Sequence, residues 1–301
     1  MNDEKSLPER PLVSIIVVSY NTCEMTLDCL RSVQSQTSIP YEVIVVDNAS
    51  SDGSAEAIAA EVPQVRLMAE STNHGFAKGN NLAAVEATGR YLLLLNPDTV
   101  VLDHAIDRLV HFAERTPSAK IWGGRTLFAD GSSNPASCRR RMTAWSAWCR
   151  TTGLDAAFSS STLFNGEAYG GWDRGEERED DIVSGCFFLI ERNFWQAMGG
   201  FDLSYEMYGE EADLCLRASR VGARPRVTQD ATIVHHGGAS EAVRSQKHVR
   251  LIRAKITLAH RHMGRLRALV TIWMLRIWPL SRWLAAEVPA RRQAVLARPI
   301  I

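Results

Sequence analysis

Short, uninterrupted apolar runs constrain the fold of this 301-residue chain more than any other feature of its sequence. They occupy residues 12–18, 43–46 and 91–95, and the first two are rich in β-branched residues. Continuous apolarity, without alternation, is typical of strands buried on both faces, as in a parallel sheet covered by helices. The segment 22–36 carries apolar residues at helical spacing, so the first two runs and this segment predict a strand–helix–strand unit.

A second unit of the same kind follows. Residues 55–61 indicate a helix, 65–68 a short strand, and 77–87 another helix that is closed by Gly89, before the buried strand 91–95. Alternating elements over about 120 residues predict an open α/β sheet. In such sheets, ligands bind outside the carboxyl ends of the strands.

Polar, turn-forming clusters follow three of the predicted strands. They are residues 19–21, 47–50 and 96–98, with the sequences Ser-Tyr-Asn, Asp-Asn-Ala-Ser and Asn-Pro-Asp. Any one cluster also fits an ordinary turn or a helix cap. Their repetition at three strand ends favours a binding site at this edge of the sheet.

The second half of the chain is less regular. Residues 182–190 indicate another buried strand, 210–221 a helix with Gly222 as its C-cap, and 227–234 a strand. The stretch 130–181 contains a triple arginine at 139–141 followed by two tryptophans. This stretch indicates either a solvated basic loop or a contact with an anionic ligand.

Charge is divided unevenly along the chain. The 34 basic and 34 acidic residues cancel, yet residues 244–301 hold 13 Lys and Arg against one acid, leaving the preceding part acidic. A basic helical tail on an acidic body predicts contact with an anionic surface and no nucleic-acid partner. In residues 266–283, three tryptophans lie among arginines, which suits the headgroup region of a bilayer; packing on the protein is the alternative.

Other features place the chain in a reducing compartment. The six cysteines are scattered, which predicts reduced thiols, and the polar N-terminus has no signal-peptide character. The most apolar tail segment has only eight consecutive uncharged residues, too few to span a bilayer.

Two sets of residues could serve a reaction on a nucleotide-bound sugar. Asp98 and His235 each follow a predicted strand and could hold a divalent cation against a diphosphate, although a hydrogen-bonded core histidine is the alternative for His235. Glu210, Glu211 and Asp213 open a helix after a glycine- and aromatic-rich run, where a general base could act; favourable interaction with the helix dipole is the alternative.

Six strings in order closely resemble the family 2 glycosyltransferases, and within them the bacterial rhamnosyltransferase-like branch. They are VSIIVVSYN (13–21), EVIVVDNASSDGS (42–54), NHGFAKGNN (73–81), LLLLNPDT (92–99), GGFDLSYEMYGEEADLCLR (199–217) and HHGGAS (235–240). The resemblance runs over about residues 11–262. It implies a GT-A fold, a Rossmann-like, mixed and mostly parallel sheet with flanking helices. It also implies a nucleoside-diphosphate-sugar donor, Mg²⁺ or Mn²⁺, and inversion at the anomeric carbon.

The resemblance also assigns residues. Those matching positions that bind the nucleotide-sugar are Tyr20, Asp47, Asn48, Asn73, Gly75, Asn80 and Asn96. Asp98 matches the carboxylate that contacts the metal, and His235 the later histidine that completes the metal and pyrophosphate site. Glu211 stands where the family usually has a catalytic aspartate, so either its backbone sits further back or Glu210 shares the role. Asn96 replaces the first aspartate of the metal motif, which lowers the negative charge of the site.

The predicted organisation is a catalytic domain at 11–243 and a basic, membrane-associating helical tail at 244–301. The nucleotide-binding half covers about 11–100 and the acceptor-binding half about 101–243. The predicted enzyme transfers L-rhamnose from dTDP-L-rhamnose to a cell-envelope polysaccharide or a polyprenyl-diphosphate-linked glycan. It does so as a cytoplasmic protein, peripheral on the inner face of the cytoplasmic membrane.

Several alternatives remain from the sequence. Galactofuranose, glucose or N-acetylhexosamine from a UDP-sugar would fit the same motifs. A non-catalytic module that binds a nucleotide-sugar is a further alternative. Such a module would tolerate loss of the proposed base or of Asp98, yet both carboxylates are present in this sequence. A dehydrogenase or P-loop enzyme is disfavoured because the first strand is followed by neither GxGxxG nor GKS/T.

Overall fold

The computed structural model describes residues 10–205, 207–237 and 244–296, with the side chains of 247–281 in the last of these segments. Residues 1–9, on which the N-terminal interpretation rests, lie outside the described residues, as do Gly238, Ala239 and Ser240 of the last family string and the side chain of Trp283.

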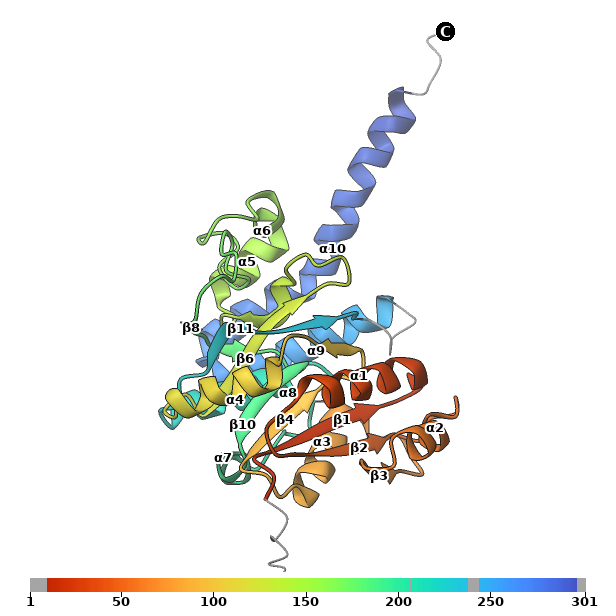
Figure 1. The fold of residues 1–301 in the computed structure, drawn as a ribbon. Coiled ribbons are helices and arrows are strands. Elements are labelled where there is room, and N and C mark those ends of the chain that lie inside the picture. The colour runs from red at the N-terminus through yellow and green to blue at the C-terminus, as the bar shows by residue number, and fades with distance from the viewer. Residues whose placement is uncertain (1–9, 206, 238–243, 297–301) are drawn as a thin grey trace, which may run out of the picture.

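One mixed, mostly parallel sheet forms the centre of the molecule (Figure 1). Its strand order is β3-β2-β1-β4-β10-β6-β11-β5, and β8 pairs with β11 off this path. The strands are β1 (Val13–Ser19), β2 (Tyr41–Asp47), β3 (Arg66–Ala69), β4 (Tyr91–Leu95), β5 (Thr99–Val101), β6 (Ile121–Leu127), β8 (Arg178–Glu179), β10 (Phe187–Glu191) and β11 (Arg226–His235). A separate two-stranded sheet pairs β7 (Cys138–Arg139) with β9 (Ile182–Val183).

Helices cover both faces of the central sheet. The helices α1 (Cys23–Gln36), α2 (Ser54–Glu61) and α4 (Ala105–Arg115) pack on one face, and α3 (Gly75–Glu86), α7 (Arg192–Met198) and α8 (Glu210–Arg220) on the other. Along β1, Val13, Ile15 and Val17 enter the first core, and Ile16 and Val18 the second. This two-sided burial is the physical reason for the continuous apolar runs.

The predicted α/β sheet is confirmed, and the strand at 91–95 has the predicted bounds. Two local predictions were wrong. Residues 182–190 form two strands, β9 and β10, separated by the turn Ser184-Gly185-Cys186. Gly89 does not close α3, which ends at Glu86. It lies where any Cβ would come 2.7 Å from the backbone nitrogen of Ser14.

Strand β10 fixes which residues meet at the carboxyl edge of the sheet. It runs antiparallel to both β4 and β6, pairing Phe187 with Leu95, and β11 is parallel to β6. The strands β1, β2, β4 and β11 therefore all end at the same edge. There the short strand β5 pairs Thr99 with His235.

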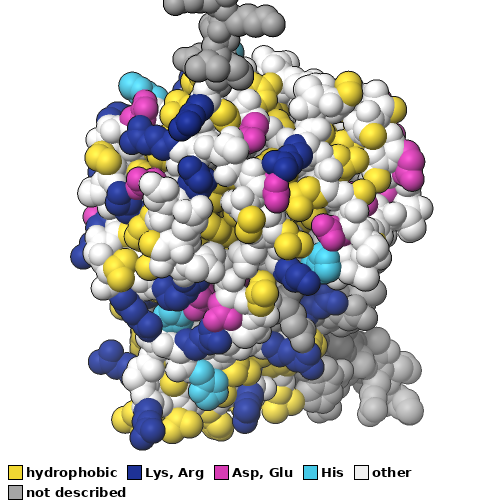
Figure 2. Space-filling view, turned by 90° about the horizontal axis from the view of Figure 1, so that it is seen from below, with side chains coloured by type: hydrophobic (Ala, Val, Ile, Leu, Met, Phe, Trp, Pro, Cys, Tyr) yellow, Lys and Arg dark blue, Asp and Glu magenta, His cyan; other side chains and the backbone are white. Residues whose placement is uncertain are grey.

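The C-terminal part of the chain is helical, as predicted. Helix α9 (Arg244–His262) packs against α8, and α10 (Arg265–Leu296) packs against α9 and α5 (Ala144–Thr152) before it runs out from the body (Figure 1). Seen from below, basic side chains gather with hydrophobic ones at the lower edge of the surface (Figure 2). Within the described residues, no helix combines the length and the apolarity needed to cross a bilayer.

Candidate active site

The loops after β1 and β2 form one connected platform at the carboxyl edge of the sheet. The backbone nitrogen of Asn21 donates to Ser50 Oγ at 2.9 Å, and that of Ser51 donates to Asn21 Oδ1 at 2.8 Å. The side chain of Tyr20 is left 40% exposed at this edge. Its ring is therefore available to stack on a nucleotide base.

Asp47 ends β2 and carries an unused buried acceptor. Its Oδ2 accepts a hydrogen bond from the backbone of Ser50 at 3.0 Å, whereas Oδ1 is buried and has no hydrogen-bond partner within the described residues. A buried carboxylate oxygen without a donor is costly, so Asp47 is suited to accept one from a bound ligand.

Three of the predicted amide residues lie at or near the start of α3, and one of them, Asn48, holds it against the end of β2. Asn48 donates through Nδ2 to the carbonyl of Gly75 at 3.3 Å and accepts from the backbone of His74 at 3.3 Å. Asn73 Oδ1 accepts from the nitrogen of Gly75, which has a positive φ of 74°. Asn80 instead donates to the carbonyl of Phe76 inside the helix, and its amide is buried there.

Asp98 and His235 are in contact, as the sequence predicted for a shared site. His235 Nε2 lies 3.2 Å from Asp98 Oδ1 and 3.3 Å from Asn96 Nδ2, and the backbone of His236 donates to the carbonyl of Asp98. Burial opposes ionisation of both side chains. The hydrogen bond from His235 and the charge of that residue nevertheless lower the pKa of Asp98. Interactions of His235 with Asp98 and Cys186 raise the pKa of the imidazole to about 10.

These two side chains fit a divalent cation only together with other ligands. A carboxylate oxygen is a donor that Mg²⁺ and Mn²⁺ prefer, commonly with phosphate oxygens and water completing the shell. An imidazole nitrogen is a less usual ligand for these ions and binds a metal only as the neutral ring. In the described parts of the chain, no group of three or more His, Cys, Asp or Glu side chains is arranged to hold a metal. The donor set thus fits a cation that also binds a diphosphate.

The turn Ser184-Gly185-Cys186 connects this pair to Glu211. On one side, the nitrogen of Asn96 donates to the carbonyl of Cys186 at 3.1 Å. On the other, a Cβ on Gly185 would lie 3.7 Å from that of Glu211 and 3.5 Å from the ring of Phe76. The structure therefore links Glu211 to Asp98 and His235 through this turn. No direct contact joins them among the described residues.

Glu211 and Glu210 occupy different environments although they are adjacent. Glu211 forms an ion pair with Arg139 at 2.7 Å and accepts from the nitrogen of Gly209 at 3.2 Å. Glu210 is only 3% exposed, and its Oε2 has no hydrogen-bond partner within the described residues. Burial and the adjacent Glu211 charge raise the pKa of Glu210 to about 8. Of the two, Glu211 is the carboxylate whose negative charge is balanced by a direct ion pair.

Asp213, the third acid of this helix, is a structural anchor. It is buried, pairs with Arg217 at 2.7 Å and accepts from His262 Nε2 at 2.7 Å. Burial raises its pKa, but these hydrogen bonds outweigh burial and lower it. Arg217 also donates to the carbonyls of Met198 and Gly200, so Asp213 ties α8 to α9 and to the segment before it.

Sequence reasoning missed several residues that organise the site. Arg139 was noted as part of a basic run, but its pairing with Glu211 joins residues 72 positions apart and leaves no local signal. Asn81 exchanges two hydrogen bonds with the backbone of Phe201, fastening α3 to the segment before α8. The two adjacent asparagines at 80–81 indicate a polar position in a helix. The sequence does not indicate which of the two amides bonds to the segment before α8.

The comparisons with known proteins agree with this arrangement. The sequence profile described as "Glycosyl transferase family 2" matches residues 14–172, more than half of the chain. The chain belongs to glycosyl transferase family 2. The family resemblance, the enzyme class and the GT-A fold predicted from the sequence are thereby confirmed.

Two curated relatives indicate which members this glycosyltransferase resembles. It is 27% identical over 286 residues to the N-acetylglucosaminyl-diphospho-decaprenol L-rhamnosyltransferase of Mycobacterium tuberculosis, covering 88% of this chain and 89% of that protein. It is 30% identical over 237 residues to the O-antigen biosynthesis protein RfbC of Myxococcus xanthus. That match covers 76% of this chain but only 18% of the longer Myxococcus protein.

Solved structures agree on the fold. The mannosyltransferase PcManGT from Pyrobaculum calidifontis, solved in complex with GDP-Man and Mn²⁺, aligns with a TM-score of 0.59 at 18% identity, covering 97% of this chain and 77% of that one. TarS of S. aureus aligns with a TM-score of 0.53 at 14% identity, over 85% of this chain and 41% of that one. At these identities the likeness establishes the fold alone.

The contrast between the two glutamates predicts a pH-dependent stability difference. With a folded pKa near 8 against about 4.5 unfolded, Glu210 contributes stability at low pH that is lost as pH rises through this window. The E210Q variant removes this titration. Its melting temperature relative to wild type should therefore rise between pH 5 and pH 8, by on the order of 5 °C. Differential scanning fluorimetry across this range measures the effect.

The matched control is E176Q, which changes an exposed glutamate in the loop before β8. Its melting temperature relative to wild type should change between pH 5 and pH 8 by much less than that of E210Q, because an exposed side chain is solvated in both the folded and the unfolded state. An E210Q difference no larger than that of E176Q would contradict the assignment of a neutral buried carboxyl.

Proposed function

We propose that this glycosyltransferase moves a sugar from a nucleoside-diphosphate donor to a hydroxyl of a cell-envelope glycan by a single inverting displacement. The proposed donor is dTDP-L-rhamnose and the proposed acceptor is a polyprenyl-diphosphate-linked glycan. The likeness to the N-acetylglucosaminyl-diphospho-decaprenol L-rhamnosyltransferase supports the sugar and the acceptor class. The observation that carries the proposal is the Asp98–His235 contact, connected to Glu211 through one turn.

The proposed donor site lies across the ends of β1, β2 and β4. Tyr20 would stack on the base and the unused Oδ1 of Asp47 would accept a hydrogen bond from the nucleoside, with Asn48 holding the adjoining loop. The loop at Asn73 and Gly75 would approach the phosphates, while Asn80 supports this loop from inside α3.

The proposed metal ligands are Asp98 and His235, and the nearby Asn96 side-chain amide would donate to a phosphate oxygen. When bound, Mg²⁺ or Mn²⁺ would offset the negative charge that develops on the departing diphosphate. The chain's own part is to keep the carboxylate and the imidazole facing each other at the strand ends.

Glu211 is the proposed base. Its carboxylate would take the proton of the acceptor hydroxyl as that oxygen bonds to the anomeric carbon, and the bond to the nucleoside diphosphate breaks on the opposite face. Glu210, buried beside it, would support the position of the helix start without exchanging a proton at neutral pH.

We further propose the division into a nucleotide-binding half at about 11–100, an acceptor-binding half at about 101–243 and a tail at 244–301 that meets the inner face of the cytoplasmic membrane. The surface that supports membrane contact is the exposed stripe Leu266, Leu269, Val270, Trp273 and Leu280 on α10, hereafter the apolar stripe. The exposed arginines 265, 267 and 276 flank it.

The opposite side of α10 is already packed. Ala268, Ile272 and Leu275 are buried, and Thr151 of α5 donates to the carbonyl of Met274. Each helix face therefore has a separate role, and packing on the protein does not use the apolar stripe. Tryptophan and leucine beside arginine suit a bilayer interface, where each cation near an anionic surface contributes about 1 kcal/mol.

The donor is tested by thermal shift with dTDP-, UDP- and GDP-sugars, with and without Mn²⁺. The matching donor at a hundredfold excess over its dissociation constant stabilises by about 2.7 kcal/mol, a shift of about 5 °C. We expect dTDP-L-rhamnose with Mn²⁺ to give the largest shift and D98N to lose it. A metal-independent shift, or one that D98N retains, would contradict the metal assignment. A UDP-sugar ranking first would replace rhamnose.

The base is tested by E211Q, which keeps the shape of the side chain and removes its proton acceptor. Transfer of sugar to N-acetylglucosaminyl-diphospho-polyprenol should fall by about 10²–10⁴-fold, with donor binding retained. E210Q is the matched control and should keep transfer within a few-fold. Near-normal turnover by E211Q would assign the base to another residue.

Membrane contact is tested with the full chain and vesicles containing phosphatidylglycerol. We expect co-sedimentation that weakens as salt rises from 50 to 500 mM and falls at least tenfold in L269Q/W273Q. V85Q/L203Q, which changes two exposed apolar residues elsewhere, is the matched control. Binding that L269Q/W273Q retains would exclude the apolar stripe as the contact.

A further inference from the structure

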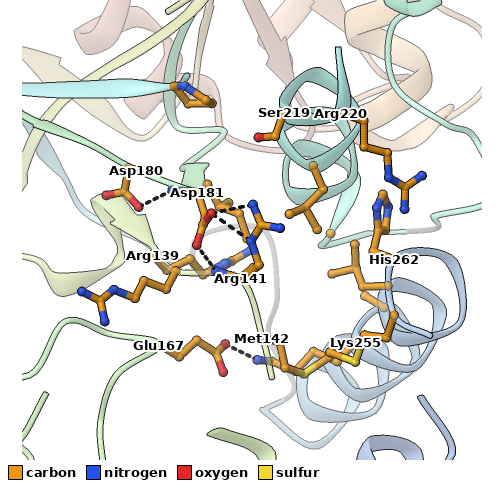
Figure 3. Close-up of a pocket in the computed structure, with 18 of the residues that line it drawn as sticks. Arg139, Arg141, Met142, Glu167, Asp180, Asp181, Ser219, Arg220, Lys255 and His262 are labelled. Carbon is orange, nitrogen blue, oxygen red and sulfur yellow. Dashed lines mark hydrogen bonds and ion pairs between the residues drawn. The ribbon is translucent and has the colours of Figure 1, made fainter. Parts of the chain in front are cut away.

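A cavity of about 430 Å³ is lined by Arg139 and Gly209, which both contact the carboxylate of Glu211. Its walls come from the segments around β7 and β9, from α8, and from α9 of the tail (Figure 3). Neither Asp98 nor His235 lines it. It is therefore separate from the proposed donor site.

The cavity combines a cationic wall with an apolar one. Six basic residues line it: Arg139, Arg140, Arg141, Arg220, Arg224 and Lys255. The apolar wall includes Met142, Leu251, Leu258 and Met263. No Phe, Tyr or Trp is among the described residues that line the cavity, so an aromatic platform for a sugar ring is missing there.

Some of this positive charge is already paired. Arg141 lies 2.8 Å from Asp181, Arg224 lies 3.3 Å from Glu179, and the buried Lys255 lies 2.5 Å from Glu167. Figure 3 shows the first and third of these pairs, each joined by dashed lines. They hold the walls in place without supplying free charge.

Arg139 pairs with Glu211, so two of the six basic residues that line the cavity are left without such a pair among the described residues. In the part of the chain that the structure describes, neither Arg140 nor Arg220 has a carboxylate partner. Arg140 lies over the ring of Tyr169, 4.7 Å from its centroid, and Arg220 donates to the carbonyl of Arg261 at 3.0 Å. Two guanidinium groups without carboxylates match a ligand with two negative charges, and arginine pairs readily with phosphate oxygens.

The cavity also adjoins the proposed base directly. Gly209 and Arg139 both line it, and both contact the carboxylate of Glu211. A group bound among these arginines would hold the rest of its molecule next to Glu211. The charged ligand of the cavity is thus placed to be part of the acceptor.

We propose that this cavity binds the diphosphate of a polyprenyl-diphosphate-linked acceptor, with Arg140 and Arg220 contacting the phosphate oxygens and the apolar wall contacting the first isoprene units. The inference rests on the proposed function and deepens it by naming the acceptor subsite. The apolar wall favours a lipid-linked diphosphate over a free one. Because α9 supplies Lys255, Leu251 and Leu258 and is followed directly by α10, the subsite adjoins the tail proposed to meet the membrane.

Isothermal titration of the full chain with farnesyl diphosphate in EDTA tests the subsite without a metal-dependent contribution from the donor site. Saturable binding is expected, at least tenfold weaker in R140Q/R220Q, and weaker by several-fold in each single variant. Inorganic diphosphate should bind at least fivefold more weakly than farnesyl diphosphate, and farnesol should not bind measurably.

Two controls separate the possible causes. R31Q/R108Q removes two exposed arginines far from the cavity and should leave binding within twofold, which excludes a general charge effect. D98N should also leave farnesyl diphosphate binding unchanged, and R140Q/R220Q should keep the thermal shift given by the nucleotide-sugar, which shows that it is folded.

Absence of farnesyl diphosphate binding, or equal binding by R140Q/R220Q, would overturn the proposal. Inorganic diphosphate binding as tightly as farnesyl diphosphate would overturn the lipid assignment. Loss of farnesyl diphosphate binding in D98N would place the ligand in the donor site instead. If the arginine variants behave as expected while D98N keeps donor binding, the proposed donor site fails and the acceptor subsite stands.

Discussion

The Asp98–His235 contact depends on strand β10 running against its neighbours. Because β10 is antiparallel to β4 and β6, the parallel pair β6–β11 points the same way as β4, and His235 emerges beside Asp98. The short β5 then pairs Thr99 with His235 and fixes their register. At Gly124 of β6, a Cβ would come 2.2 Å from the carbonyl of Ala231, so only glycine allows β11 to approach this closely. The positions of Asp98 and His235, the proposed cation ligands, thus depend on strand direction and on the close approach of β11 to β6 at Gly124.

This dependence explains what the sequence could and could not predict. Residues 13–95 form parallel units whose strands, helices and polar ends follow one another locally, so their order and even the bounds of β4 could be predicted. In the second half, the signals are weak or non-local. The turn at Gly185 lies inside an apolar run, β5 has three residues, and the Arg139–Glu211 pair spans 72 positions. The convergence of Asp98 with His235 came from family resemblance, not from periodicity.

The neighbouring glutamates show a second limit of sequence reasoning. Residues adjacent on a helix point about 100° apart, so Glu210 faces the packed interior and Glu211 faces Arg139. Burial and the adjacent Glu211 charge raise the pKa of Glu210, whereas Glu211 forms a direct ion pair with Arg139. The Glu-Glu sequence alone does not distinguish the environments of the two side chains. The difference appears only once α8 is placed against its neighbours.

Helix α9 is bound to the acceptor half through buried polar contacts. Lys255 pairs with the buried Glu167, whose pKa is lowered to about 2 by the charges of Lys255 and Arg150 against the effect of burial. His262 Nε2 donates a hydrogen bond to the buried carboxylate of Asp213. Removing one partner of a buried ion pair typically costs about 3–5 kcal/mol, because the other charge is left uncompensated. Deleting the chain from residue 244 would therefore remove one partner from each of two buried carboxylates, Glu167 and Asp213, as well as the apolar stripe. Such a deletion would not distinguish the proposed membrane contact from a loss of stability, whereas point changes on the exposed face of α10 would.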